Sequence, residues 1–261
     1  MITLTTDLDD IYVSQMKAAI LSLNPAAKIV DISHDTSRFN VRRASFAILC
    51  AARIFPVNTV HVCVVDPGVG SERRGIVVEA GEVYFVGPDN GVFTLPLSIQ
   101  DSYTAYSIEP ERAEKMTSRA ISVTFHGRDI FAPVAAALDS GEHPGSFGRE
   151  IGDPVLFEIP QPRVEGGRAW GTVLFIDGFG NVITDIPGHM LDLPPGSTLE
   201  VSMGGKTFPC ISASTYADAE PGQLIALVGS QGTYEISLNR GKATSAIGGT
   251  EGDEIGIAME D

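Results

Sequence analysis

A carboxylate and two arginines stand at opposite ends of a glycine-rich stretch, VVDPGVGSERRG, at residues 64–75. The apolar runs on both sides are typical of buried strands, so the structural interpretation is a strand–turn–strand connection. The same spacing also suits chemistry, because it places the carboxylate of Asp66 and the cation of Arg73 or Arg74 in one loop. The chain has 18 Lys and Arg residues against 33 Asp and Glu residues, so two adjacent arginines here need an explanation.

Other polar residues also follow apolar runs. They are Asp7, the GPDNG stretch at residues 87–91, His126 in TFHGRDIFAP, and Asp177 in FIDGFGNVITDI. Ligands of sheet proteins commonly bind outside the strand ends, where such loops gather. Each position also has a structural interpretation: the glycine-rich stretches are turns, and Asp7 caps a helix that begins near Tyr12. Their joint placement favours a binding site.

Three common kinds of site are disfavoured. The histidines are scattered, without an HExxH pair or metal-like Cys/His spacing, and His61 is expected to be a packed core residue, so we expect no metal site. The stretch GVGSERRG lacks the GK[ST] ending of a phosphate loop, and no clear helix follows it. A nucleophilic serine is not indicated, because the chain has no GxSxG motif and neither Ser71 nor Ser122 has an obvious histidine partner.

Composition predicts a soluble, cytoplasmic globular protein. The 261 residues are 43% hydrophobic and 20% charged, and no apolar stretch is long enough to span a membrane. The N-terminus, MITLTTDLDD, is soon acidic and is interpreted as a strand, not a signal peptide. A net charge of −15 argues against binding nucleic acid or an anionic membrane, and is compatible with a small cationic substrate. Cys50, Cys63 and Cys210 are expected to be free thiols.

The first part of the chain alternates strand and helix patterns. Period-two or continuous apolar runs predict strands, and apolar residues at helical spacing predict helices. This rhythm indicates an α/β domain, residues 1–160, with a central sheet covered by helices. The expected strands are 2–6, 28–32, 60–65, 75–80 and 83–87, and the expected helices are 12–23, 41–55 and 130–141, with Pro133 tolerated in the first turn of the last helix.

After the Gly- and Pro-rich segment 141–154 the pattern changes to short alternating runs separated by turns, with no sustained helical period. It predicts a smaller all-β domain, residues 168–261, built as a barrel, with the boundary between residues 155 and 168. The expected strands lie at 170–177, 181–186, 198–204, 206–213, 223–229, 233–239 and 254–260.

Five stretches, TTD, VVDPGVGSERR, VGPDNG, TFHGRDIFAP and FIDGFGNVITDI, follow one another through nearly the whole chain. Together they resemble the S-adenosyl-L-methionine (SAM) hydroxide adenosyltransferases, which are adenosine-forming SAM hydrolases related to the SAM-dependent fluorinase and chlorinase. The resemblance implies hydrolysis of SAM to adenosine and L-methionine without a cofactor. It also implies a homotrimer, with sites between one subunit's N-terminal domain and a neighbour's C-terminal domain.

The resemblance implies a catalytic triad of Asp66, Arg73 and His126, with Arg73 and not Arg74 at the matching position. Methionine leaves from a sulfonium as a neutral thioether, so the difficulty lies in activating a water and aligning it with the ribose 5′ carbon. Arg73 is suited to stabilise hydroxide character, while Asp66 and His126 accept or relay the proton. An adjacent arginine weakens a carboxylate as a base, which favours Asp66 as an orienting partner and Arg73 and His126 as the groups that control the water.

The resemblance also implies substrate contacts. Asp7 matches an aspartate that binds the ribose diol, and Asp177 matches an acid that receives the methionine ammonium. Phe179 and Asn181 match an aromatic and an amide that line the ligand, and Ser230 matches a serine near the methionine carboxylate. Phe39 is a looser counterpart of an aromatic near the ribose or adenine.

Departures from the family pattern concern the ribose and methionine contacts. The segment DLDDIYV is shorter than usual and lacks a glycine, so Asp9 or Asp10 could replace Asp7 at the ribose. Gln231 stands where the halogenating relatives have an arginine, and Asn40 replaces a usual aspartate.

Two alternatives to hydrolysis remain open. One is a SAM-dependent halide transferase, which Asp66 argues against because those relatives have a tyrosine there. The other is a protein that binds SAM or adenosine without turning it over.

Overall fold

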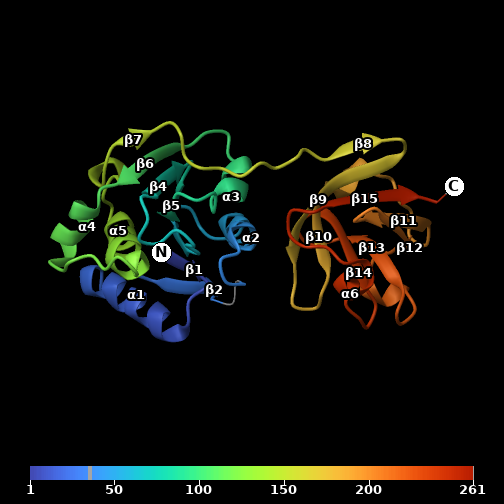
Figure 1. Cartoon of the computed structure of the whole chain (residues 1–261), viewed down its shortest axis with the longest axis horizontal. Coiled ribbons are helices and arrows are strands. Elements are labelled where there is room, and N and C mark those ends of the chain that lie inside the picture. Colours follow the sequence, from blue (N-terminus) through green and yellow to red (C-terminus); the bar gives the residue numbers. More distant parts are fainter. Residues whose placement is uncertain (35–36, 261) are drawn as a thin grey trace. The chain divides into compact units, whose positions relative to one another are not determined.

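The computed structural model describes residues 1–34 and 37–260. The chain divides into two compact units, Met1–Phe157 and Glu158–Asp261 (Figure 1). The first unit is a mixed α/β domain and the second is built almost entirely from strands. The predicted fold class, an α/β domain with a helix-covered sheet followed by a smaller all-β barrel, is confirmed.

A seven-stranded sheet, in the order β2-β1-β3-β5-β4-β6-β7, forms the centre of the first unit. Neighbours among β2, β1, β3 and β5 pair in parallel, and β4, β6 and β7 are added in antiparallel pairings. β1 (ITLTT) and β3 (VHVCV) are buried along their whole length, and their buried polar residues are the threonines of β1 and His61 of β3. The strands are β1 Ile2–Thr6, β2 Ile29–Ser33, β3 Val60–Val64, β4 Gly75–Ala80, β5 Val83–Pro88, β6 Thr104–Ile108 and β7 Glu150–Ile151.

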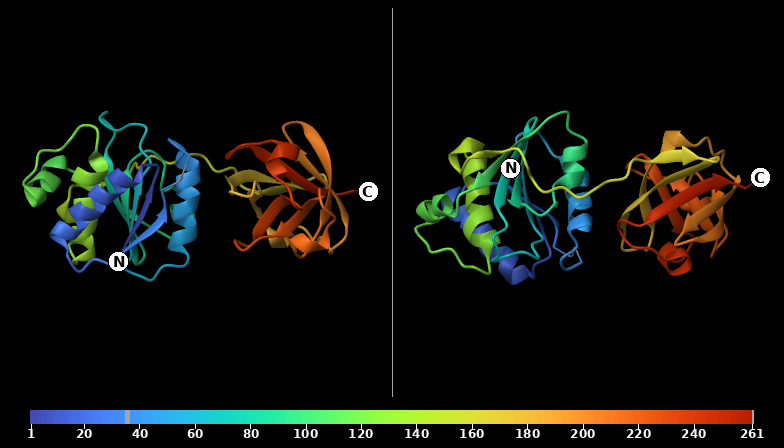
Figure 2. Two further views of the ribbon diagram at one scale, coloured as in Figure 1. Left: turned by 90° about the horizontal axis from the view of Figure 1, so that it is seen from below. Right: turned by 45° about the horizontal axis from the view of Figure 1, so that its top comes forward.

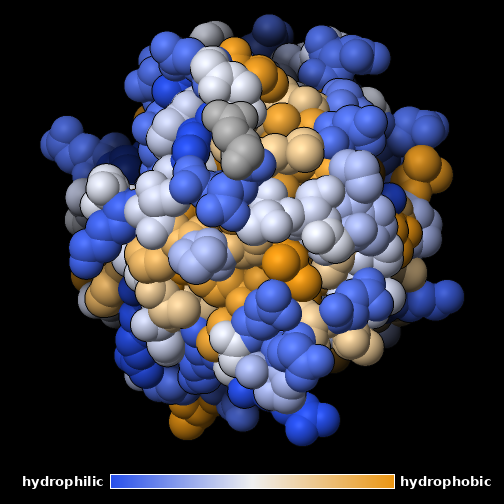
Figure 3. Space-filling view, turned by 90° about the vertical axis from the view of Figure 1, so that its right-hand side faces the viewer, coloured by the Kyte–Doolittle hydropathy of each residue, from blue (hydrophilic) through white to orange (hydrophobic). Residues whose placement is uncertain are grey.

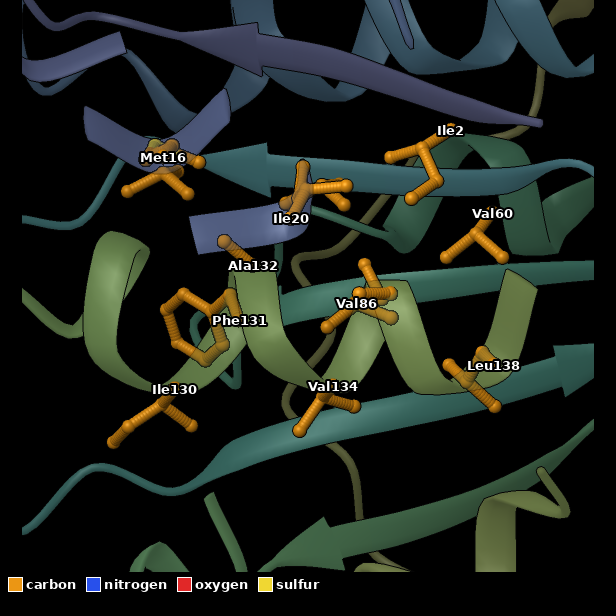
Figure 4. Close-up of a cluster of buried hydrophobic side chains, with 14 of the residues drawn as sticks. Ile2, Met16, Ile20, Val60, Val86, Ile130, Phe131, Ala132, Val134 and Leu138 are labelled. Atoms are coloured by element: carbon orange, nitrogen blue, oxygen red, sulfur yellow. The ribbon is translucent and has the colours of Figure 1, made fainter. Parts of the chain in front are cut away.

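Helices cover both faces of this sheet (Figure 2). On one face lie α1 (Asp10–Leu23), α4 (Pro110–Thr117) and α5 (Ala132–Asp139), and on the other lie α2 (Val41–Ala52) and α3 (Thr94–Ser98). The larger core forms beneath the first group, where side chains of α1 and α5 pack on those of β1, β3 and β5 (Figure 4). This buried apolar layer holds the strand ends in fixed positions.

Most expected elements of the first unit are present within a few residues of their predicted bounds. The helix expected at 130–141 differs, because a π-helical turn, Gly127–Phe131, precedes α5. Pro133 lies in the first turn of α5, as predicted. Four elements of the first unit were not predicted: α3, β6 and α4, between residues 94 and 117, and the two-residue strand β7.

The second unit is a closed barrel of seven strands. Its sheet has the order β10-β14-β13-β12-β11-β15-β9-β8, and an additional pairing of β9 with β10 closes the ring, so that β8 is left on the outside edge. Alternate residues of the strands fill the interior. The elements are β8 Arg163–Glu165, β9 Arg168–Ile176, β10 Val182–Pro187, β11 Thr198–Met203, β12 Lys206–Ser212, β13 Leu224–Val228, β14 Thr233–Leu238, α6 Ala243–Ile247 and β15 Glu254–Met259.

The outer surface of this unit is mixed in character. Figure 3 shows hydrophobic residues near the centre of one face and hydrophilic residues around them. Several large apolar side chains of the barrel strands are exposed, including Val164, Val228 and Met259. Such scattered exposure is ordinary for a globular domain.

Two predictions about individual residues are confirmed. Cys50, Cys63 and Cys210 are free thiols. His61 is a packed core residue: it is 1% exposed, its Nδ1 lies 2.8 Å from Oγ1 of Thr3, and burial lowers the pKa of its imidazole to about 4. Among the helices of the described residues, none has the length and apolar character needed to cross a membrane.

Candidate active site

The parallel strands β1 and β3 bring two aspartates to one edge of the sheet. Thr6, the last residue of β1, lies opposite Val64, the last residue of β3. Asp7 therefore follows β1 at the same edge at which Asp66 follows β3, and the backbone N–H of Asp7 donates to the carbonyl of Val64 at 3.4 Å. The carboxyl ends of parallel strands are the usual place for ligands in such sheets.

The loop after Asp66 folds back on itself. The N–H of Val69 donates to the carbonyl of Asp66 at 3.3 Å, and Ser71 donates to the carbonyl of Gly68 through both its N–H and its hydroxyl. Gly70 has a φ of 79°, and a Cβ there would lie 2.7 Å from the carbonyl oxygen of Val123. These tight turns return the chain, so that a residue seven positions after Asp66 faces its carboxylate.

Asp66, Arg73 and His126 form one hydrogen-bonded group. Nε of Arg73 lies 3.0 and 3.1 Å from the two carboxylate oxygens of Asp66, and Nη2 also contacts Oδ2. The same Nη2 lies 2.8 Å from Nδ1 of His126. The side chains of Arg73 and Asp66 are 10% and 6% exposed, so the ion pair is largely desolvated and its bonds are stronger than those of a surface pair.

The contact with Arg73 defines the proton positions on His126. A guanidinium is always protonated and can only donate, so Nδ1 of the imidazole accepts and the ring proton of the neutral form lies on Nε2. Burial lowers the pKa of His126 below its ordinary 6.5, and the charge of Arg73 lowers it further, while Asp66 and Asp129 act in the opposite direction. His126 is therefore neutral at pH 7.

The π-helical turn supports both ends of this group. It begins directly after His126 and ends at Phe131, whose buried ring lies 5.3 Å from the guanidinium carbon of Arg73. Gly75 allows the ring of Phe131 to approach closely, because a Cβ on Gly75 would lie 2.8 Å from that ring. Such π turns recur at functional sites, because they re-aim side chains within a helix.

Arg74 points to a different set of partners. Its Nε donates to the buried Asp89 at 2.9 Å, and its Nη1 and Nη2 donate to the side chain and carbonyl of Asp153. Asp89 also accepts from the N–H of Val155 at 2.7 Å. Arg74 therefore ties the end of β5 to the segment that leaves the first unit, and only Arg73 belongs to the group with Asp66.

The GPDNG stretch forms a hydrogen bond to the residue that precedes Asp66. Nδ2 of Asn90 donates to the carbonyl of Val65 at 2.9 Å, and its Oδ1 accepts from the N–H of Val92. Asn90 thus holds the residue immediately before Asp66. The sequence indicated a turn there, and the structure adds this contact across 25 residues.

Asp7 does not cap α1, so that structural interpretation was wrong. The N-cap position is occupied by Asp9, which makes no side-chain capping bond. Oδ2 of Asp7 instead accepts from the N–H of Phe39 at 2.8 Å. Phe39 has a φ of 65° and is 65% exposed, a strained conformation for an aromatic residue. Asp9 pairs with Arg38 at 3.1 Å on the surface.

Three predicted substrate contacts lie together in the second unit. Asp177, Phe179 and Asn181 line a pocket of about 670 Å³ at the tip of the β9–β10 hairpin. The sequence reasoning missed two cations on its wall, Arg240 and Lys242, which follow β14 in the stretch NRGK. Other residues of its wall are Tyr216, Leu238 and Asn239.

The carboxylate of Asp177 organises its own loop. Oδ1 accepts from the N–H groups of Phe179 and Asn181, both at 2.9 Å, and Oδ2 accepts from Nδ2 of Asn181 at 3.0 Å. These bonds hold the exposed ring of Phe179 above the pocket. A ligand cation would compete with Asn181 for Oδ2.

Ser230 lies away from this pocket. It is exposed in the β13–β14 turn, next to Gly232, whose carbonyl accepts from Gly188 just beyond β10. Asp177 precedes the opposite end of β10, a strand of six residues, which spans about 20 Å. The structure therefore does not bring Ser230 and Asp177 of one chain to the same amino acid.

No obvious metal centre competes with this description. Within residues 1–34 and 37–260, no group of three or more His, Cys, Asp or Glu side chains is arranged to hold a metal ion. The hydrogen-bonded group formed by Asp66, Arg73 and His126 consists of one carboxylate, one guanidinium and one imidazole. This set suits the binding and activation of a small polar nucleophile.

An α/β domain with this group at its strand ends, followed by a closed β-barrel, defines a two-domain protein of α/β-plus-barrel type. Family models describe both parts: the SAM hydroxide adenosyltransferase N-terminal domain matches residues 2–148, and the C-terminal domain of that family matches residues 171–256. The chain belongs to the SAM hydroxide adenosyltransferase family.

Individual relatives agree with this membership. The chain is 37% identical over 249 residues to an (R)-S-adenosyl-L-methionine hydrolase of Thermus thermophilus, covering 94% of this chain and 93% of the relative. A crystal structure of an uncharacterized conserved protein from Thermotoga maritima is 38% identical, with a TM-score of 0.90 over 99% of this chain and 100% of the other. A fluorinase of an Actinoplanes species is more distant, at 25% identity over 88% of this chain and 87% of the fluorinase.

Proposed function

We propose that this protein hydrolyses SAM to adenosine and L-methionine. The observation that carries the proposal is the part-buried, hydrogen-bonded group of Asp66, Arg73 and His126 at the strand ends, in a chain that is 37% identical to a SAM hydrolase. In this reaction a water oxygen forms a bond to the ribose 5′ carbon, the bond from that carbon to the sulfonium sulfur breaks, and methionine leaves as a neutral thioether.

Arg73 supplies the electrostatic part of the reaction. In the part of the chain that the structure describes, no residue accepts a hydrogen bond from Nη1 of Arg73, so its N–H groups there are available to a water. The fixed positive charge stabilises hydroxide character as the proton leaves. Asp66 keeps the guanidinium in place, and because both its oxygens already accept hydrogen bonds it orients Arg73 and does not act as the base.

His126 takes the proton of the water. Nδ1 carries the lone pair of the neutral ring, and it lies 2.8 Å from Nη2 of Arg73. The water displaces the N–H of Arg73 from Nδ1 and transfers its proton there, so that Nδ1 becomes protonated while the fixed charge of Arg73 stabilises the hydroxide oxygen. The imidazolium then releases the proton to solvent, which balances the loss of the sulfonium charge.

The remaining residues bind the substrate in this proposal. Oδ1 of Asp7, the carboxylate oxygen that does not accept from Phe39, binds the ribose diol, and Phe179 and Asn181 line the ligand. Asp177 receives the methionine ammonium. Because Ser230 of the same chain lies at the opposite end of β10, it contacts the carboxylate of that methionine only when a neighbouring subunit of the proposed homotrimer supplies it.

Turnover by the purified protein tests the reaction. The protein is incubated with SAM in chloride-free buffer prepared in H₂¹⁸O, and the products are separated by chromatography. We expect adenosine with one ¹⁸O atom and unlabelled methionine, and we expect both to be lost with Arg73→Ala and His126→Ala. SAM that stays intact on the protein would show a binding protein without turnover.

A halide transferase is the second candidate, favoured by the more distant similarity to fluorinases, one of which is 25% identical. A carboxylate at position 66, in a buried ion pair, disfavours an incoming halide and suits a water. Repeating the incubation with chloride distinguishes the two: a 5′-chlorinated nucleoside would replace the hydrolase proposal.

The proposal includes a cofactor-free enzyme, a homotrimer and a cytoplasmic location. Activity should persist after treatment with EDTA and gel filtration. Light scattering should give three times the 27.7 kDa mass of one chain. The three free thiols suit a reducing compartment, which fractionation of the source cells checks.

A further inference from the structure

The position of His126 depends on a loop that has no strand or helix of its own. Residues 118–125 connect the end of α4 to His126, the residue that directly precedes the π-helical turn. Ser118 has a φ of 53°, and Val123 in the middle of the loop is 71% exposed. Such a loop needs bonds from elsewhere to hold a catalytic imidazole within a few tenths of an ångström.

Asp129, three residues after His126, closes this loop. It is 6% exposed, and its Oδ2 accepts from the backbone N–H of Ser122 at 2.9 Å, while its own N–H donates to the carbonyl of Phe125 at 3.2 Å. Burial alone would raise the pKa of Asp129, but hydrogen bonds from Arg128 and from Ser122 hold that pKa below its usual value. Asp129 is therefore ionised, and both of its carboxylate oxygens accept hydrogen bonds.

Arg128 connects the closed loop to α1. It binds Asp129 with two nitrogens, Nε to Oδ1 at 2.6 Å and Nη2 to Oδ2 at 2.8 Å, and its Nη1 donates to Oε1 of Gln15 at 3.0 Å. Its guanidinium also lies 5.1 Å from the ring of Phe125, which meets Tyr12 edge to face at 5.4 Å. The loop before His126 is thus fixed to the helix that follows Asp7.

From these contacts we propose that Asp129 is a positioning residue for the reaction, which holds His126 so that its Nδ1 meets the guanidinium of Arg73. This inference rests on the proposed function. Asp129 acts in two ways: its bond to Ser122 sets the path of the loop, and its negative charge offsets part of the positive charge of Arg73 at the imidazole. The charged groups facing His126 are Arg73, Asp66 and Asp129.

The test compares Asp129→Asn with Asp153→Asn. Each substitution removes one carboxylate that pairs with an arginine, but Asp153 pairs with Arg74, is exposed and lies outside the group. We expect Asp129→Asn to lower kcat up to about 100-fold, as expected for a displaced catalytic group, with KM for SAM changed less than about threefold. Asp153→Asn should leave both constants within about twofold.

A second readout does not need turnover. Titration of the imidazole nitrogens by NMR, with His126 assigned by its absence in His126→Asn, gives the pKa of His126 directly. We expect that pKa to fall in Asp129→Asn, because the remaining neighbour Arg73 opposes protonation, and to stay unchanged in Asp153→Asn. A change in folding alone would not lower this pKa selectively.

The outcomes separate this inference from the proposed function. An unchanged kcat, or an unchanged pKa of His126 in a folded Asp129→Asn protein, would overturn the role of Asp129. If the wild-type protein does not hydrolyse SAM, the proposed function fails, and the NMR comparison still decides whether Asp129 positions His126. If Asp129→Asn does not fold, Arg128→Lys replaces it as the test, because lysine keeps the positive charge but cannot form the two hydrogen bonds to Asp129. We expect the same fall in kcat. A wild-type kcat in Arg128→Lys would overturn the inference.

Discussion

Arg73 meets its partners through the planar shape of its guanidinium. One edge contacts both oxygens of Asp66, and Nη2 reaches Nδ1 of His126 at the same time. A lysine ammonium is a single point charge and cannot reproduce two fixed directions. Arg74, its neighbour, uses the same shape for Asp89 and Asp153.

The substitution Arg73→Lys should therefore lower kcat by about 100-fold or more, in the range seen when one stabilising donor is removed. The matched variant, Arg74→Lys, should keep kcat within about threefold and lower the free energy of unfolding by about 1–3 kcal/mol, because the buried Asp89 loses a donor. Steady-state kinetics and denaturant unfolding of both variants measure this. Equal losses of kcat would contradict the division of roles between the two arginines.

The pH dependence of activity should report His126. Its pKa is held below 6.5 by burial and by Arg73, so the neutral form that activates water persists below pH 6.5 and is lost as pH falls through the lowered pKa. The same sign holds for stability, because the unfolded chain binds the proton more readily than the folded one. A profile of kcat/KM should show an acidic limb below pH 6.5. A limb well above pH 6.5 would assign the titration to another group.

At the scale of elements, β5 and β3 approach so closely that one position needs glycine. A Cβ on Gly87 would lie 2.4 Å from the carbonyl oxygen of Cys63 and 3.0 Å from the ring of Phe93. The backbone of Cys63 cannot move aside to make room for a Cβ, as the end of a flexible side chain can. The strand ends that carry Asp66 and Asn90 depend on this contact.

Gly87→Ala should therefore destabilise the first unit by about 3 kcal/mol, at the upper end for overpacking. Gly152→Ala serves as the control, because nothing lies within 4 Å of a Cβ there, and it should change stability by less than about 0.5 kcal/mol. Thermal melts of both proteins measure the difference. A Gly87→Ala protein with wild-type stability would contradict the packing of β5 on β3.

The β9–β10 hairpin carries a buried carboxyl group. Asp185 accepts from the N–H of Thr172 at 2.6 Å, and its Oδ2 is buried without a partner among the described residues. Burial raises the pKa of Asp185 to about 6. The folded state thus favours the protonated acid, and its ionisation above pH 6 costs stability.

Asp185→Asn should stabilise the barrel at pH 8 by about 1 kcal/mol, or about 5 °C in Tm, because the amide can accept from Thr172 without a charge. The advantage should shrink as pH falls through 6 and the wild-type acid becomes protonated. Melting curves at pH 8 and pH 5 check this. A constant difference at both pH values would show that ionisation of Asp185 is not the cause.

At the scale of the whole molecule, each unit has hydrophobic cores of its own. We expect two calorimetric transitions, with Gly87→Ala moving only one and Asp185→Asn moving only the other. Separate cores make this possible, since each unit loses its own buried surface on unfolding. A single transition moved by both substitutions would show that the units unfold together.

Sequence patterns predict features that arise among neighbouring residues, and they miss features that depend on contacts between residues far apart in the chain. β1 and β3 were predictable because both are rich in the β-branched residues that favour strands. The five-residue α3 and the π turn before α5 were not, because one turn is too short for a periodic pattern. For the candidate site, the motif residues could be named, but the bonds of Asn90 to Val65 and of Asp129 to Ser122 depend on tertiary folding.

Local sequence patterns were sufficient to predict the two fold types, the strands and the polar residues at their ends, because hydrophobic period and turn residues act locally. Family resemblance indicated Arg73, but three features emerged from the folded chain: how the two arginines divide their partners, that Nδ1 of His126 accepts, and that Ser230 lies at the far end of β10 from Asp177. Those features depend on strand pairing and on the directions of hydrogen bonds between residues far apart in the chain, which a local pattern does not record.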